Sequence, residues 1–249
     1  VFLVIGCRSG QEAKVTNLVS EPMHFIGEDS LLFRFPSKIR IFDSLAVLQT
    51  RDDEMLQIFK YPEFEYLASV GRRGRGAGEI LGISAFEVFG DTLSIMEMSS
   101  KSIYSYCLRD IFDSKKAPSS IRRYEGLRDP LLSCDFGESE IVSVYASSDS
   151  RFSVVSRDGS VLRNSSYGLV EDKTAVSEKI PSEYLPTLWQ SVLAYDADDG
   201  VAVSATMLGD VIEIFDVSDM SSRVIVGSGG FPDVYKEGKS VSVGRIDGY

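Results

Sequence analysis

The sequence predicts an all-β protein built from repeating units of four short antiparallel strands. Pairs of apolar segments are joined by short turns rich in acidic residues and glycine, as in β-hairpins. These turns recur at a nearly constant spacing, and no strong amphipathic helix pattern competes with them. Four-stranded units that repeat at about 40 to 50 residues are typical of propeller blades, each covering the face of its neighbour. We therefore expect a β-propeller.

Composition and charge agree with a globular protein and exclude one class of partner. The chain has 249 residues, 43% of them hydrophobic, which is enough to bury a sizeable core. Its 37 acidic and 26 basic residues give a net charge of −11, which argues against nucleic acid as a partner because phosphate binding needs a basic surface. No apolar run reaches the roughly 18 residues that a membrane-spanning helix needs, so we expect membrane attachment only through a terminal anchor.

The spacing of the hairpin tips defines the blades. Asp43, Asp91 and Ser139 follow one another at a constant step of about 48 residues, which is a usual length for a propeller blade. The fourth tip, at Asp199, comes after a longer step of roughly 60 residues, and Asp247 follows it at the shorter step again. The sequence therefore predicts about four blades and the start of a fifth.

Further strands are predicted at fixed distances from these tips. Third strands are expected at one constant offset beyond the first four tips, at Ile58, Tyr106, Val154 and Ile214. Outer strands are expected at a larger offset that the first and fourth repeats share, at Ser69–Gly71 and Ile225–Gly227, both of which enter glycine-rich turns. The outer strands of the second and third repeats are less clear. These positions complete a four-stranded blade.

The N-terminal segment resembles a bacterial lipobox. An apolar run ends in Val4, Ile5 and Gly6 just before Cys7, which is the residue that such signals lipidate. A lipid on Cys7 would attach the protein to a membrane without spanning it. The alternative is a short first strand, Phe2–Ile5, with Cys7 buried.

The domain organisation follows from this interpretation. Residues 1–7 are expected to be a truncated lipoprotein signal segment, and residues 8–22 a polar tether without strand alternation. Residues 23–249 are then a partial β-propeller domain. The longer fourth interval places an insertion within Gly168–Pro186, so this segment and nearby Trp189 are candidates for contact with a partner. The alternative is that Trp189 belongs to the core.

One stretch of the first repeat resembles a known family. Ile58–Leu67 followed by Ser69–Glu79 is similar to the strand and G-x-x-G-x-G-P-G-E loop of the six-bladed, TolB-like β-propeller lipoproteins of Bacteroidetes. The matching residues are Gly71, Gly74, Gly76, Gly78 and Glu79. Ala77 stands where the family usually has proline, a departure that affects the rigidity of the loop. The resemblance implies a six-bladed ring, of which roughly 80 to 110 residues would follow Tyr249.

The glycine-rich loop has two interpretations. Arg72, Arg73 and Arg75 concentrate positive charge in an acidic chain, so the loop is a candidate anion site. The alternative is a turn between blades, with its arginines paired to carboxylates and Glu79 accepting backbone hydrogen bonds. A phosphate loop of the Walker type is excluded, because no Gly-Lys-Ser/Thr follows and no helix pattern begins after Glu79.

The sequence offers few groups for catalysis or metal binding. His24, the only histidine, precedes the first blade, and the two asparagines are Asn17 and Asn164. Catalytic histidine pairs and multi-histidine zinc sites are therefore not expected, and we predict no catalytic residue, metal or cofactor. Cys107 and Cys134 are expected to be buried thiols rather than a disulfide.

Together these features predict a function in the bacterial cell envelope. The lipobox and the resemblance imply an extracytoplasmic protein, in the periplasm or at the outer membrane, anchored by lipid on Cys7. We expect a binding or scaffolding module that holds an unknown protein or glycan partner. The alternative is a propeller hydrolase or lyase whose catalytic residues lie in further C-terminal blades, because a propeller fold alone does not fix function.

Overall fold

A computed structural model describes residues 33–127, 131–137, 139–145, 150–165, 185–237 and 240–244. They belong to one compact unit, Phe33–Tyr249. The predictions for Cys7, for the segments 1–7 and 8–22 and for most of Gly168–Pro186 lie outside the described residues. The boundary at residue 23 therefore stays a prediction.

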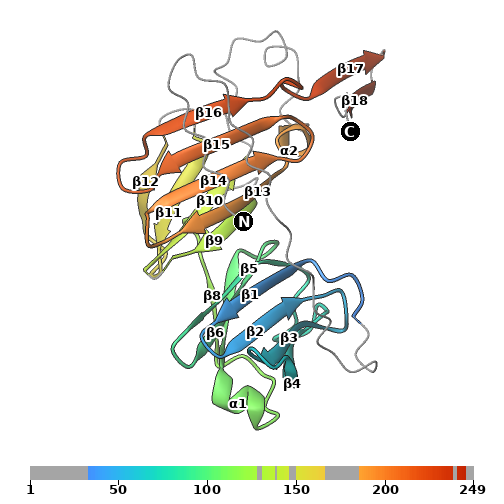
Figure 1. The fold of residues 1–249 in the computed structure, drawn as a ribbon, viewed down its shortest axis with the longest axis vertical. Helices are drawn as coiled ribbons and strands as arrows, with labels where there is room; N and C mark the ends of the chain where they lie inside the picture. Colours follow the sequence, from blue (N-terminus) through green and yellow to red (C-terminus); the bar gives the residue numbers. More distant parts are fainter. Residues whose placement is uncertain are drawn as a thin grey trace. The chain divides into compact units, whose positions relative to one another are not determined.

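Four sheets, each of four antiparallel strands in sequence order, make up most of the described chain (Figure 1). Blade 1 contains β1 (Lys38–Phe42), β2 (Leu45–Gln49), β3 (Glu54–Lys60) and β4 (Glu65–Arg72). Blade 2 contains β5 (Ile83–Phe89), β6 (Thr92–Glu97), β7 (Ser102–Cys107) and β8 (Ser120–Arg123). Blade 3 contains β9 (Leu131–Phe136), β10 (Glu140–Tyr145), β11 (Phe152–Ser156) and β12 (Val161–Asn164). Blade 4 contains β13 (Ser191–Asp196), β14 (Val201–Thr206), β15 (Val211–Asp216) and β16 (Ser222–Val226). The predicted all-β class, with four-stranded propeller blades, is confirmed.

The first four predicted tips and all four third strands are confirmed. The turns between the first and second strands of the blades contain Asp43, Asp91, Ser139 and Asp199. The positions predicted for third strands fall in β3, β7, β11 and β15, and those predicted for outer strands fall in β4 and at the end of β16. The outer strands β8 and β12, which the sequence left unclear, are four residues long with all side chains exposed, so they carry little apolar pattern.

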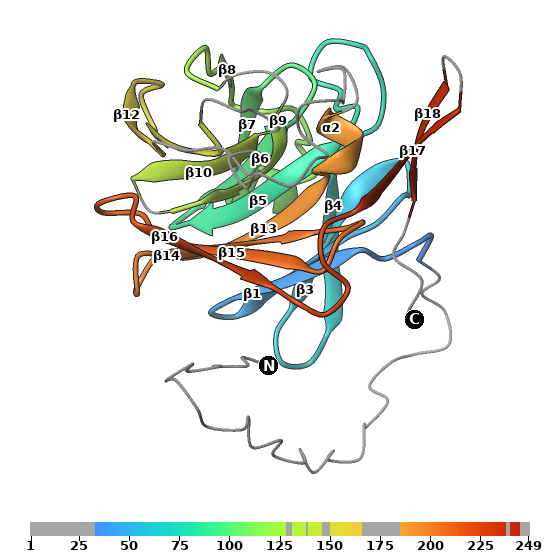
Figure 2. The same cartoon turned by 90° about the horizontal axis from the view of Figure 1, so that it is seen from above.

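The predicted position of the fifth tip is wrong. A hairpin of β17 (Asp233–Glu237) and β18 (Ser240–Gly244) follows β16, and its turn lies between Glu237 and Ser240 rather than at Asp247 (Figure 2). One reason is the first strand itself, since β17 has five residues and β5 has seven, and another is the connection between blades. Residues 227–232 join β16 to β17, whereas the longer segment 73–82 joins β4 to β5, so a constant step overestimates the distance.

Two short helices occur where the sequence predicted none. The helix α1 (Leu108–Phe112) follows β7 and buries Leu108 and Ile111 among apolar residues of blades 1 and 2. The helix α2 (Leu185–Leu188) precedes β13. Each is five residues or fewer, too short to show helical periodicity in the sequence. No helix among the described residues has the length and apolar character that crossing a bilayer requires.

The core consists of three apolar clusters, each between successive blades. Leu56 of blade 1 packs in one cluster with Phe86 of blade 2, and Met96 of blade 2 packs in the next with Phe136 of blade 3. Between blades 3 and 4, the rings of Phe152 and Phe215 stack with centroids 4.0 Å apart. Burial of each such side chain contributes roughly 1.5–3 kcal/mol. Each blade thus covers its neighbour, as predicted.

Candidate functional site

The glycine-rich loop joins β4 to β5 and contains positions whose backbone conformation favours glycine. Gly71 and Gly78 have φ values of +81° and +78°, a conformation that L side chains rarely adopt. Backbone hydrogen bonds close the loop, because the N–H of Ile80 donates to Arg72 O at 2.9 Å and that of Gly74 donates to Ile80 O at 3.2 Å. The loop is therefore a defined structure.

Glu79 fills the interior of this loop. Its Oε2 accepts a hydrogen bond from the N–H of Gly76 at 2.7 Å, and its Oε1 lies 3.5 Å from Arg72 Nε. A Cβ on Gly74 would collide with Glu79 Oε2, so glycine leaves the room that the carboxylate occupies. These contacts are those expected for a turn between blades. The position where a bound anion would meet the loop amides is taken by the protein's own carboxylate.

Arg73 and Arg75 of the same loop are exposed, and so are two arginines in segments that the backbone connects to the loop. The N–H of Arg73 donates to Asp53 O at 2.7 Å, and the N–H of Arg51 donates to Arg34 O at 2.6 Å. The loop, the β2–β3 turn and the segment before β1 are thereby joined. We call the exposed side chains of Arg34, Arg51, Arg72, Arg73 and Arg75 the arginine rim. Three carboxylates lie in the same segments, on Asp52, Asp53 and Glu79, so the rim keeps an excess of positive charge.

A second charged cluster joins the first strands of three blades. Arg40 on β1 lies 2.6 Å from the carboxylate of Glu87 on β5 and 2.8 Å from that of Asp135 on β9. Lys38 Nζ lies 4.0 Å from Asp135. Burial raises the pKa of Glu87, and the Arg40 guanidinium partly offsets that rise. The cluster satisfies its own charges, which is the property of a structural link between blades.

Sequence reasoning missed this cluster. Arg40 and Asp135 are 95 residues apart, and no local motif connects them. One signal was available, because Arg40 and Glu87 each stand two residues before the end of a first strand whose neighbours are apolar. A charge at that position in two successive blades indicates that the first strands meet.

The most deeply buried charges also link two blades. Arg151 precedes β11 in blade 3 and its Nε donates to Glu213 Oε2 on β15 at 2.9 Å, with side chains 1% and 0% exposed. Its Nη2 donates to Ser191 Oγ at 2.8 Å. Burial raises the pKa of Glu213, and the Arg151 guanidinium only partly offsets that rise.

Among the residues that the structure describes, no group of three or more His, Cys, Asp or Glu residues could hold a metal ion.

Trp189 and Cys134 lie in the interior, whereas Cys107, which was expected to be buried, is only partly buried. Trp189 is 5% exposed and makes an edge-to-face contact with Phe231, as the core alternative expects. Contact of Trp189 with a partner stays a prediction. Cys107 and Cys134 are free thiols, and burial raises the pKa of Cys134 to about 12. A thiol of that pKa stays protonated and unreactive at neutral pH.

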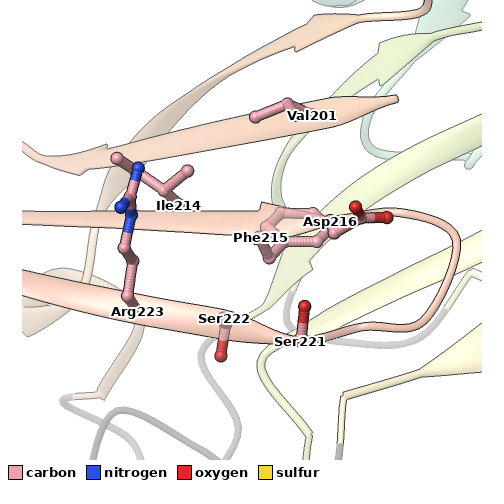
Figure 3. A pocket seen from close by; sticks show the side chains of 7 residues that line it. All are labelled: Val201, Ile214, Phe215, Asp216, Ser221, Ser222 and Arg223. Carbon is pink, nitrogen blue, oxygen red and sulfur yellow. The ribbon is translucent and has the colours of Figure 1, made fainter. Parts of the chain in front are cut away.

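A shallow pocket of about 300 Å³ lies on blade 4 (Figure 3). It is lined by Val201, Ile214, Phe215, Asp216, Ser221, Ser222 and Arg223. Val192 and Ile212 are exposed elsewhere in the same sheet, so the pocket is one part of a broader apolar surface. In a propeller such a surface is where the next blade packs, and β17 begins that blade. We therefore assign no ligand to it.

Several solved structures are similar to this chain. One is a protein of Bacteroides fragilis NCTC 9343 described as exported, at 13% identity and TM-score 0.47 over 80% of this chain and 73% of that one. Another is the extracellular domain of a hybrid two-component system protein of B. thetaiotaomicron, at 11% identity and TM-score 0.48 over 82% and 26%. A third is PorZ, a surface component of the type-IX secretion system of Porphyromonas gingivalis, at 12% identity and TM-score 0.44 over 85% and 26%.

The chain thus spans about a quarter of the last two proteins. No curated protein matches the sequence. A family model does, since the model described as TolB-like 6-blade propeller-like matches residues 17–249. With nearly the whole chain matched and its sheets folded as blades, the chain belongs to the TolB-like six-bladed propeller family.

Proposed function

We propose that this protein is a lipid-anchored extracytoplasmic binding module that presents its arginine rim to an anionic partner. The observation that carries the proposal is the gathering of five exposed arginines on one rim of blade 1, in a chain of net charge −11. An acidic protein repels anionic partners over most of its surface, so a local excess of arginine directs them to one place. The rigid loop holds part of that surface in position.

Binding is better supported than catalysis in the part of the chain that the structure describes. Glu87 and Asp135, on the first strands of blades 2 and 3, are both paired with Arg40. Glu213 is likewise paired with Arg151. A general acid or base must be able to reach a substrate, whereas these carboxylates are already paired with arginines. The alternative of a hydrolase or lyase depends on residues in further blades.

The lipid anchor is tested on Cys7. We expect mass spectrometry of the protein from membranes to find a diacylglyceryl group on Cys7, and Cys7→Ala to release the protein from the membrane fraction. A protein that retains Val1–Gly6 and an unmodified Cys7 would remove the anchor from the proposal. It would leave the arginine rim untouched.

The binding role is tested with a soluble anion. A fluorescent hexa-aspartate peptide should bind the 249-residue chain by fluorescence anisotropy, and salt should weaken that binding. Arg73→Gln/Arg75→Gln should weaken it because the charge excess of the rim is lost. The matched control is Arg123→Gln/Arg163→Gln, the same charge change at exposed positions on β8 and β12. Equal loss in both variants would show that net charge alone is responsible, against the proposal.

A further inference from the structure

We infer that the anionic partner of the arginine rim is a lipid bilayer, on which blade 1 docks through phosphate headgroups. This inference rests on the proposed function and names the partner. The geometry that carries it is the combination of exposed arginines with exposed apolar side chains on the same rim.

Two large apolar residues lie among the arginines. Phe35 is 68% exposed and has a φ of +50°, and Leu81 in the glycine-rich loop is 46% exposed. The guanidinium of Arg51 lies 5.4 Å from the centroid of the Phe35 ring, so an aromatic side chain and a positive charge lie next to each other on the rim. Surfaces that lie in a membrane interface combine apolar insertion with attraction of basic side chains to anionic lipid. A soluble acidic partner would use the arginines but would not require exposed Phe35 and Leu81.

The position of the rim in the chain favours the same partner. Arg34 and Phe35 are among the first described residues, and the expected anchor at Cys7 precedes them by one short segment. That segment has about 26 residues and spans at most roughly 90 Å, so an anchored chain cannot move the rim farther than that from the bilayer. Confinement of this kind raises the effective concentration of headgroups at the rim, and a contact that is weak in solution is then occupied.

The expected strength is modest and depends on salt. Each arginine near an anionic membrane contributes about 1 kcal/mol, which corresponds to about fivefold in affinity. Asp52, Asp53 and Glu79 on the rim reduce that total, and so does the net charge of −11. The contact should therefore weaken as the Debye length shortens from about 10 Å at 0.1 M salt to about 3 Å at 1 M.

The experiment uses the 249-residue chain carrying Cys7→Ala, so that no lipid anchor contributes. Binding is measured by co-sedimentation with phosphatidylcholine vesicles and with equimolar phosphatidylcholine and phosphatidylglycerol vesicles. We expect binding only to the anionic vesicles, and Arg73→Gln/Arg75→Gln should weaken it about 10- to 30-fold. Arg123→Gln/Arg163→Gln should bind like the parent. Phe35→Asn should weaken it severalfold, because asparagine tolerates a positive φ but cannot insert into the interface.

Three results would overturn the inference. Equal binding to both kinds of vesicle would remove the role of the arginines. Binding of hexa-aspartate without binding to anionic vesicles would indicate a soluble partner, which keeps the proposed function and rejects the bilayer. Binding to neither probe would reject both. Circular dichroism and urea unfolding of each variant exclude loss of fold as the cause.

Discussion

Arg151 shows what a single buried charge contributes to this fold. Its guanidinium is 1% exposed and lies 2.9 Å from a carboxylate oxygen of Glu213, which is 0% exposed. Arg151→Met would leave that carboxylate buried without its cation, so we expect the free energy of unfolding to fall by about 3–5 kcal/mol. Urea denaturation of the variant and the wild type measures this loss of stability.

A paired variant separates this cause from poor packing. Arg151→Met/Glu213→Leu removes both charges and should recover most of the lost stability, because an apolar pair replaces an ion pair at little net cost. Arg163→Met, at an exposed position on β12, should change stability by less than about 0.5 kcal/mol. A loss below about 1 kcal/mol for Arg151→Met would contradict this account.

Asp158 in the β11–β12 turn gives a prediction for acid pH. Hydrogen bonds from the Ser156 hydroxyl and from the N–H and hydroxyl of Ser160 lower its pKa to about 2. A lowered pKa stabilises the fold above the unfolded value of about 3.9, and this contribution is lost as the pH falls through 2. Asp158→Asn keeps an acceptor oxygen and should be less stable at pH 7, with a difference from wild type that shrinks between pH 4 and 2. A difference that is independent of pH there would assign the effect to packing.

At the scale of elements, the regular parts of each blade were predictable and the connections were not. The third strand β15 carries alternating buried residues that period-2 patterning identifies, and β3 is a short apolar run that is buried on both faces. The outer strand β8 exposes all four residues, so only its pairing with β7 defines it. The helix α1 depends on packing of Leu108 and Ile111 against blade 1, which is tertiary information.

The glycine-rich loop was recognisable because its glycines serve local geometry. Gly74 leaves the space that the Glu79 carboxylate fills, so Gly74→Ala should displace Glu79 and break its hydrogen bond to Gly76. We expect a loss of about 1–2 kcal/mol in urea unfolding. In a Glu79→Ala background the same substitution should cost almost nothing, which a double-mutant cycle tests. Gly82→Ala, where no atom lies within 4 Å of the added Cβ, is the control. Additive losses would exclude Glu79 as the neighbour that matters.

At the scale of the whole molecule, the sequence predicted the stacking of blades but not the charges that join their first strands. Apolar periodicity indicates that sheets cover one another, as the three core clusters show. It does not say which polar side chains meet, because Arg40 and its partner Asp135 are separated by 95 residues. The arginine rim was predictable only in its loop, since Arg34 and Arg51 join it through backbone pairing.

The link made by Arg40 spans three blades, so its loss should affect the cooperativity of the fold as well as its stability. Arg40→Met would leave Glu87 without its arginine and Asp135 with only Lys38, 4.0 Å away, and we expect the free energy of unfolding to fall by about 2–3 kcal/mol at pH 7. Buried carboxylates that lose their cation have raised pKa values in the folded state. Their destabilising effect is absent below the unfolded pKa, grows as the pH rises above it and is complete above the folded pKa. The deficit should therefore shrink toward pH 4.

Urea unfolding across that pH range measures both quantities, since a smaller denaturant slope would report blades that unfold separately. Lys38→Met is the matched control, because the ammonium lies 4.0 Å from Asp135 and is 33% exposed. It should cost less than about 1 kcal/mol and leave the slope unchanged. Both variants could instead lose the same stability, with no dependence on pH. The first strands would then be held together by their apolar neighbours, and the Arg40 cluster would not stabilise the fold.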